Sequence, residues 1–137
     1  MLGGINLYIS LYSIVPYICG VSCGYLNINN YEVYIEYEED EVYENPSFIA
    51  LPYIDSLIYR NLKNEFLNKY FPRKSKTFIK MNDDEFEDYF HIMINDNLLT
   101  DDWYKYEDDF KIKILKNWCD DHNIQYTLKK QNSDEVL

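Results

Sequence analysis

The stretch YLNINNYEVYIEY, residues 25–37, decides the fold class of this chain. At its centre lie Asn29 and Asn30, and asparagine tolerates the positive φ angles of a tight turn. After the turn, apolar and aromatic residues alternate with polar ones, which is the period of a β-strand. The pattern predicts a β-hairpin whose second arm has one face toward a core and the other bearing Glu32 and Glu36.

Three amphipathic helices are predicted after the hairpin. The first has apolar residues at four-residue spacing from Ile54 to Tyr70, and Pro72 ends the run. The second begins at Asn82, a good N-cap residue, and Glu85 three positions later completes a capping-box pattern.

The third helix has Thr100 as its predicted N-cap, because the hydroxyl can accept from free backbone amides. Asn123 suits the left-handed conformation that ends a helix. Lysines lie toward the C-terminal end of this predicted helix, Lys111 among them, and cations there are stabilised by the negative end of the helix dipole. The predicted buried stripes of the second and third helices are Phe86, Tyr89, Phe90, Met93 and Ile94, and Trp103, Tyr106, Phe110, Ile114 and Trp118.

Two further strands are predicted near the ends of the chain. Apolar and polar residues alternate from Ile5 to Leu11, and Ile124 to Leu128 reads as a short strand. The predicted class is therefore α+β: an N-terminal antiparallel hairpin or small sheet, three helices and a short C-terminal strand. A length of 137 residues fits one domain, over 1–130, followed by a frayed tail at 131–137.

Net charge and its distribution limit the kind of partner. The formal net charge is −11, whereas binding along nucleic-acid phosphates needs clustered Lys and Arg, so we expect no direct nucleic-acid binding and a protein partner with a basic surface. Residues 1–59 contain eight carboxylates and no Lys or Arg. Residues 60–80 hold seven basic side chains and one carboxylate, and residues 83–109 hold eleven carboxylates and one lysine. These blocks predict a surface with separate acidic and basic regions.

The cysteine count and the N-terminal segment bear on location. Three cysteines without a basic leader region favour reduced thiols in the cytoplasm. Residues 1–31 are uncharged and long enough to span a bilayer. Pro16, Asn6, four glycines and three serines dilute the segment, and no basic residue flanks it, so a membrane helix is not expected.

Two motifs in the third helix resemble a known family. WYKY at 103–106 and NWCDDHNI at 117–124 are similar to the C-terminal signature of the bacterial Uncharacterised Protein Family 158. Three upstream elements follow in the family's order, namely the hairpin residues 25–33, the acidic connector with Asn45-Pro46, and Leu51-Pro52, so the resemblance covers roughly residues 25–124. At 83–87 acidic residues replace the family's Phe-Arg-Arg-Phe-Lys. The resemblance implies an architecture and no activity.

One candidate catalytic pair lies in the second predicted helix. His91 follows Glu87 by four residues and Asp88 by three, so a helix brings imidazole and carboxylate together. Such pairs are frequent on solvated helix faces, and the sequence places no nucleophile beside this one. We therefore predict no catalytic residues and favour a non-enzymatic protein, with a small metal-dependent hydrolase as an alternative.

A metal site can be drawn from four residues, Cys19, Cys23, Cys119 and His122, as a Cys3His zinc site. Their spacings are common by chance, and cysteines beside apolar residues are usually small buried hydrophobes. No metal and no cofactor is predicted.

Two charged surfaces are the candidate binding sites. The hairpin and the connector after it supply an acidic face, the hairpin acidic set: Glu32, Glu36, Glu38, Asp40, Glu41 and Glu44. A basic patch in the loop after the first helix consists of Arg73, Lys74, Lys76 and Lys80. We expect this patch to pair with the protein's own carboxylates or with an acidic partner.

The predicted function is an acidic interaction module that attracts a basic protein partner. One alternative is an inhibitor of the kind that phages encode, whose carboxylates imitate nucleic-acid phosphates on a DNA- or RNA-binding enzyme. The sequence predicts neither the oligomeric state nor the identity of the partner.

Overall fold

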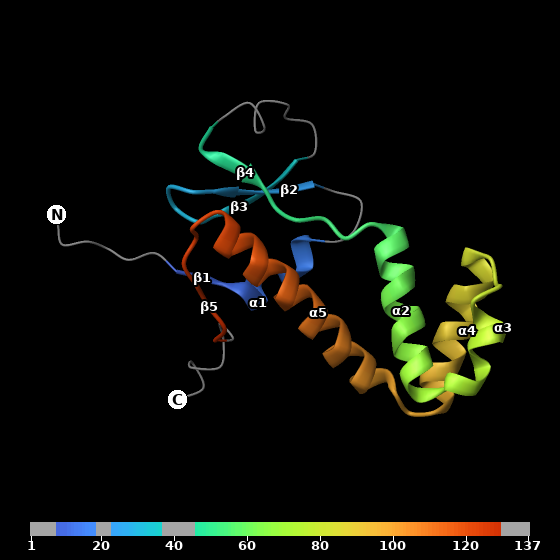
Figure 1. The fold of residues 1–137 in the computed structure, drawn as a ribbon. Coiled ribbons are helices and arrows are strands. Elements are labelled where there is room, and N and C mark those ends of the chain that lie inside the picture. Colours follow the sequence, from blue (N-terminus) through green and yellow to red (C-terminus); the bar gives the residue numbers. More distant parts are fainter. Residues whose placement is uncertain (1–7, 19–22, 37–45, 130–137) are drawn as a thin grey trace. The chain divides into compact units, whose positions relative to one another are not determined.

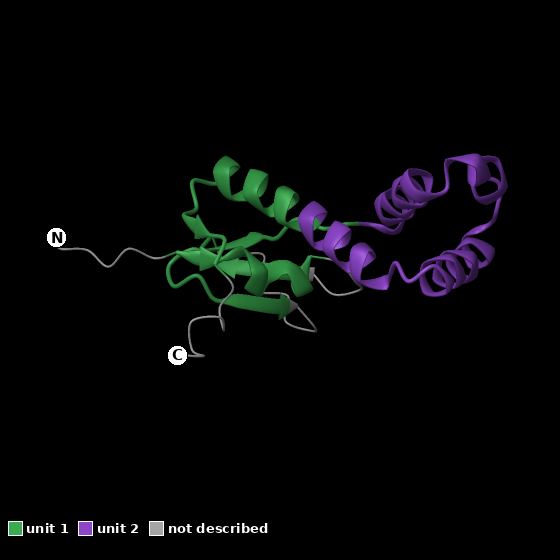
Figure 2. Cartoon of the chain, turned by 90° about the horizontal axis from the view of Figure 1, so that it is seen from below, with its two compact units in different colours: residues 1–54, 111–137 green, residues 55–110 purple. Residues whose placement is uncertain are grey.

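The chain folds into two compact units. The structure is a computed structural model, and it describes residues 8–18, 23–36 and 46–129 (Figure 1). Unit 1 comprises Met1–Ile54 and Lys111–Leu137, and unit 2 comprises Asp55–Phe110 (Figure 2). The predicted α+β class is confirmed, since both units contribute helices and the strands lie in unit 1. No sequence feature predicted the division into two units.

Unit 1 contains a three-stranded antiparallel sheet in the order β3-β2-β4. Strands β2 (Cys23–Asn27) and β3 (Val33–Glu36) form the predicted hairpin. Strand β4 (Phe48–Ala50) pairs with the other edge of β2, so that Tyr25 lies opposite Ala50. The central strand therefore includes Gly24.

Asparagine side chains stabilise the hairpin turn. The Oδ1 atom of Asn27 accepts from the N–H of Asn29 at 2.8 Å, and Oδ1 of Asn30 accepts from the N–H of Glu32 at 2.9 Å. The residue with positive φ is Tyr31, at 60°, and neither Asn29 nor Asn30. The asparagines thus act through side-chain hydrogen bonds to the backbone, as in Asx turns.

The two ends of the chain pair in unit 1. Strand β1 (Ile9–Ser10) runs parallel to β5 (Tyr126–Thr127), which confirms a short C-terminal strand. Helix α1 (Leu11–Ile14) and the 3-10 helix η1 (Val15–Tyr17) follow β1 directly. The predicted strand therefore ends at Ser10, because a helical turn buries Leu11 and Ile14 together, and residues 5–7 lie outside the described part.

Unit 2 is helical. It consists of α2 (Ser56–Tyr70), the 3-10 helix η3 (Pro72–Lys74), α3 (Ser75–Phe78), α4 (Asp83–Asp96) and the first half of α5 (Thr100–Asp121). The segment predicted as a loop after the first helix is thus partly helical. Among the described helices of both units, none combines the length and the apolar character needed to cross a bilayer.

The buried stripe of α2 differs from the prediction. Leu62 and Phe66 are buried as expected, but Ile58 and Tyr70 are each 38% exposed. A spacing of four residues advances by about 40° around a helix at each step, so a long stripe of this kind turns away from the core at both ends. Ile54 is buried in unit 1 instead, where its N–H donates to the carbonyl of Ile18 at 2.8 Å.

Of the two predicted N-cap residues, Asn82 is confirmed and Thr100 is not. Asn82 and Glu85 form the capping box of α4, with reciprocal side-chain bonds of 2.8 and 3.1 Å. The N-cap role of Thr100 was predicted wrongly, since Thr100 is already helical and its hydroxyl donates to Oδ1 of Asn95 at 3.0 Å. The chain enters α5 through Leu99, whose carbonyl accepts from the N–H of Trp103 at 2.8 Å.

Aromatic side chains form the core of unit 2. Phe66, Phe90 and Trp103 meet there, and the ring centroid of Trp103 lies 4.8 Å from that of Phe90 and 5.3 Å from that of Phe66. Phe78 and Phe86 continue the cluster, and both are buried. Edge-to-face pairs of this kind add to the free energy gained from burial.

The C-terminal end of α5 lies in unit 1. Asn123 follows the helix with a φ of 58°, which confirms the predicted stop, and the N–H of Ile124 donates to the carbonyl of Cys119 at 2.8 Å. Trp118 is buried, and its Nε1 donates to the carbonyl of Ala50 on β4 at 3.0 Å. Lys111, expected as a cation at the exposed helix end, is only 7% exposed.

Candidate functional site

The hairpin acidic set is described only in part. Glu32 is exposed beside the turn, and its Oε1 accepts from the hydroxyl of Tyr34 at 3.2 Å. Glu36 is the last residue of β3. Glu38, Asp40, Glu41 and Glu44 lie outside the described residues. The two described members of the set therefore lie at the two ends of β3, which is an edge strand of the three-stranded sheet.

A second group of carboxylates occupies α4 and α5 in unit 2. Several carboxylates of these helices form ion pairs, among them Asp83 with Arg60, Glu87 with Lys63, and Asp109 with Lys105. Seven others are exposed and form no ion pair with the described residues; one of them, Glu85, is held in the capping box of α4, which leaves six. We call these six the acidic helix set: Asp84, Asp88, Asp96, Asp101, Asp102 and Asp108. Sequence reasoning found this acidic block but assigned the binding role to the hairpin.

The basic patch lies on η3, on α3 and on the turn that follows. Arg73, Lys74, Lys76 and Lys80 are all exposed, and none is within ion-pair distance of a carboxylate of the described residues. Within the described residues these four cations therefore form no ion pair, and pairing with the protein's other carboxylates or with an acidic partner stays a prediction. Their helical placement explains the exposure, because α3 turns Phe78 into the core instead.

Two other cations of the same sequence block are structural. The guanidinium of Arg60 lies 3.8 Å from the ring centroid of Phe86, and it binds Asp83 at 2.8 Å. Lys63 binds Glu87 at 2.5 Å, with a side chain that is 13% exposed. These contacts hold both side chains within unit 2, and neither residue belongs to the predicted basic patch.

The candidate acid–base pair exists but stands on an open surface. Nε2 of His91 lies 3.6 Å from Oε2 of Glu87, while Oε1 of Glu87 binds Lys63. The side chain of His91 is 61% exposed, and neither described cavity is lined by these residues. The pair therefore lies on a solvated helix face, as the spacing predicted.

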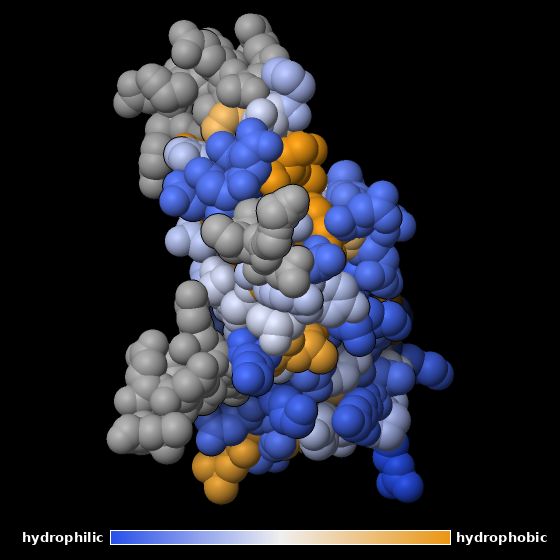
Figure 3. All heavy atoms as spheres, turned by 90° about the vertical axis from the view of Figure 1, so that its left-hand side faces the viewer, coloured by the Kyte–Doolittle hydropathy of each residue, from blue (hydrophilic) through white to orange (hydrophobic). Residues whose placement is uncertain are grey.

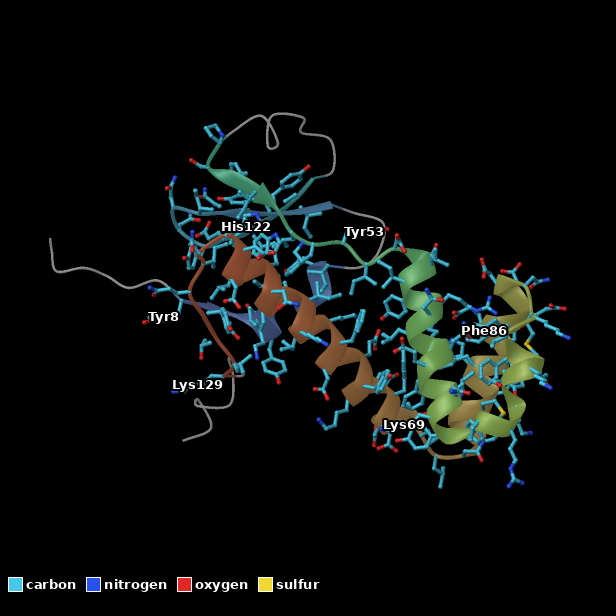
Figure 4. The ribbon with its side chains drawn as sticks, viewed as in Figure 1. Tyr8, Tyr53, Lys69, Phe86, His122 and Lys129 are labelled. Carbon is cyan, nitrogen blue, oxygen red and sulfur yellow. The ribbon has the colours of Figure 1, made fainter. Side chains whose placement is uncertain are left out.

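The Cys–His set does not converge within the described residues. Cys119 is fully buried, and burial, together with the neighbouring charge of Asp120, raises the pKa of its thiol to about 11. Nδ1 of His122 is 2.9 Å from the carbonyl oxygen of Trp118 (Figure 4). Cys19 lies outside the described residues, and only the backbone of Cys23 is described. Across the described residues, no three potential metal-binding side chains cluster.

Among the described residues, each unit has a cavity. The cavity of unit 1 has a volume of about 170 Å³ and is lined by Tyr17, Gly24, Tyr25 and residues 50–53; we call it the tyrosine pocket. The cavity of unit 2 measures about 210 Å³ and is lined by polar residues of α2 with Ser75, Phe78 and Ile79. Sequence reasoning missed the tyrosine pocket, since fifteen tyrosines spread along the chain give no local signal.

The visible surface offers little apolar area. In the view of Figure 3, hydrophilic residues dominate and hydrophobic ones form small separate patches. A large exposed apolar patch would indicate a hydrophobic docking face. The face seen in Figure 3 shows no such patch.

Comparison of the chain with protein-family models, with curated proteins and with solved structures gave no match. The resemblance to Uncharacterised Protein Family 158 therefore rests on the sequence motifs and stays a prediction. Its two tryptophans, Trp103 and Trp118, are buried in unit 2 and unit 1, respectively.

Proposed function

We propose that this protein is a non-enzymatic interaction module that binds a protein partner with a basic surface. The observation that supports the proposal is the acidic helix set, six exposed carboxylates without ion pairs to described residues, in a chain of net charge −11. Exposed carboxylates that form no ion pair within the described part of the chain remain available to an external cation. The hairpin acidic set extends the same character to unit 1.

Long-range attraction is the physical basis of the proposed binding. Clustered charge of one sign raises the association rate with an oppositely charged partner, and the effect weakens over a Debye length of about 8 Å at physiological salt. Exposed charge pairs contribute only about 0.2 to 1 kcal/mol each, so several must act together. Binding is therefore expected to depend steeply on salt and on the number of carboxylates.

Charge-neutralising variants test the proposal. The probe is a fluorescein-labelled decapeptide of alternating arginine and glycine, and its affinity is measured by anisotropy between 50 and 300 mM NaCl. We expect binding at low salt that weakens as salt rises. Changing the acidic helix set to asparagine should lower the affinity at low salt by about tenfold or more, as six weak pairs predict.

Two further variants locate the binding surface. The first changes the hairpin acidic set to glutamine and asparagine, and a loss there would assign the role predicted from the sequence. The second, Lys74→Met with Lys76→Met, is the matched control, because it alters exposed charge without removing a carboxylate. A wild-type protein that fails to bind the peptide, or variants of both acidic sets that bind as wild type does, would refute the proposal.

A further inference from the structure

The tyrosine pocket has a size and a lining suited to one side chain. Its volume of about 170 Å³ is below the roughly 300 to 1,000 Å³ of pockets for drug-sized ligands and cofactors. It equals the liquid volume of roughly five to six water molecules. Three of the residues that line it are tyrosines, and Tyr53 is 55% exposed, so the pocket is open to a partner.

The sheet of unit 1 brings these tyrosines together. Tyr25 lies opposite Ala50 in the pairing of β2 with β4, and the N–H of Leu51 donates to the carbonyl of Gly24 at 2.9 Å. A Cβ atom on Gly24 would lie 2.9 Å from Cδ1 of Leu51 and 3.3 Å from the carbonyl oxygen of Tyr17. A larger residue at position 24 would therefore have to displace the end of the Leu51 side chain and crowd the backbone of Tyr17 in the wall of the pocket.

The chemistry of the lining favours a cation. The face of a phenol ring has negative electrostatic potential and attracts ammonium and guanidinium groups, arginine more often than lysine. All seven residues of the lining are uncharged, so the lining itself contains no Lys or Arg that would repel a cation. An anionic ligand would find no cationic partner in the lining, whereas a cation can bind against the phenol rings.

We propose that the tyrosine pocket receives an arginine or lysine side chain of the basic partner. This inference rests on the proposed function, and it identifies an anchor point in addition to diffuse attraction. Residues of this kind commonly supply most of the binding energy of an interface, surrounded by weaker contacts.

Matched tyrosine variants test the anchor. Tyr53→Leu should weaken binding of the arginine–glycine decapeptide about three- to tenfold, while Tyr53→Phe, which keeps the ring, should bind like wild type. The control is Tyr8→Leu, because Tyr8 is similarly exposed at 58% in unit 1 and does not line the pocket. Figure 4 shows the two tyrosines on different sides of the sheet region. If Tyr53→Leu bound the peptide as tightly as wild type, the inference would be overturned while the proposed function stood.

A small probe tests the pocket independently of the peptide. Nα-acetylarginine amide is titrated into wild-type protein with ¹³C-labelled tyrosine rings, and its uncharged citrulline analogue is the matched ligand. We expect the ring signals of Tyr17, Tyr25 and Tyr53 to shift with the arginine probe alone, and that of Tyr8 to stay unchanged. Such shifts would support the inferred pocket even if the decapeptide failed to bind. Failure of the decapeptide alone would refute only the proposed function. Equal shifts with the citrulline analogue, or none with either probe, would overturn the inference.

Discussion

Arg60 links three parts of unit 2 through one side chain. Its guanidinium stacks on Phe86, binds Asp83 at the start of α4, and donates to the carbonyls of Phe78 and Met81 at 3.1 Å each. Phe78 is the last residue of α3, and its carbonyl also accepts from the N–H of Met81 at 3.3 Å, while Met81 itself lies after the helix. A planar group with several donors satisfies such a site, which a lysine could not do equally well.

Replacing Arg60 with Met should therefore destabilise unit 2. We expect a loss of about 2 to 3 kcal/mol in the free energy of unfolding, since hydrogen bonds from a charged group and a ring contact disappear together. Urea unfolding followed by far-UV circular dichroism measures the change. Lys76→Met is the control and should stay within about 0.5 kcal/mol of wild type, because Lys76 is exposed and unpaired among the described residues. Equal stability of the two variants would contradict this account.

Cys119 should make stability fall at alkaline pH. The ordinary pKa of the thiol is 9.0 and burial raises it to about 11, so between these values the folded state holds a proton that the unfolded state releases. The free energy of unfolding therefore decreases as pH rises through this range. Urea titrations at several pH values from 8 to 11 measure the slope, and Cys119→Ala should show a shallower decrease than wild type. An identical slope in both proteins would show that the thiol does not contribute.

Among the elements, α4 has the most complete start. Its capping box satisfies free backbone donors, and the carboxylates of its first turn complement the positive end of the helix dipole. Its inner face places Phe86 and Phe90 in the aromatic core. Local sequence and tertiary packing thus agree along this helix.

Removing the N-cap tests how much the local sequence at the start of α4 contributes to stability. Asn82→Ala should lower the free energy of unfolding by about 1 kcal/mol, the usual value for a lost N-cap. The matched control is Asn61→Ala on an exposed face of α2, which should be neutral or slightly stabilising because alanine favours a helix interior. Thermal and urea unfolding of both variants measures the difference. A cap variant as stable as the control would contradict the role of Asn82.

In the whole molecule, unit 2 is inserted into unit 1 between Ile54 and Lys111. Helix α5 belongs to both units, and most of the stability of a helix in a protein comes from tertiary packing. Unfolding of unit 2 alone would leave a long disordered loop in unit 1 and would remove packing from half of α5. The two units are therefore expected to unfold together.

The two tryptophans provide one probe for each unit. Trp103 lies in unit 2 and Trp118 in unit 1, and both are buried. Trp103→Phe leaves Trp118 as the sole tryptophan, and Trp118→Phe leaves Trp103, so excitation at a wavelength selective for tryptophan reports on one unit at a time. In each variant, the urea midpoint from fluorescence should coincide with that from far-UV circular dichroism, as two-state unfolding requires. Separate midpoints would show that the units unfold independently.

Local signals in the sequence were sufficient for several elements. The alternation after Asn30, the capping pair at Asn82 and Glu85, and the left-handed Asn123 predicted the hairpin, the start of α4 and the end of α5. These features depend on neighbours a few residues apart, so the sequence contains the necessary information. The same holds for the spacing of Glu87 and His91, although the sequence could not show that the pair lies on an open surface.

Only the tertiary structure decided which charges stay available and where the tyrosines meet. Arg60 and Lys76 belong to one basic block of the sequence, yet the first is held in the fold and the second is exposed. The tyrosine pocket joins residues from η1, β2 and the segment after β4, which the sheet brings together. The sequence by itself determined an acidic α+β protein with its local turns and caps. Long-range packing decided the rest, because burial and pairing depend on residues far apart along the chain.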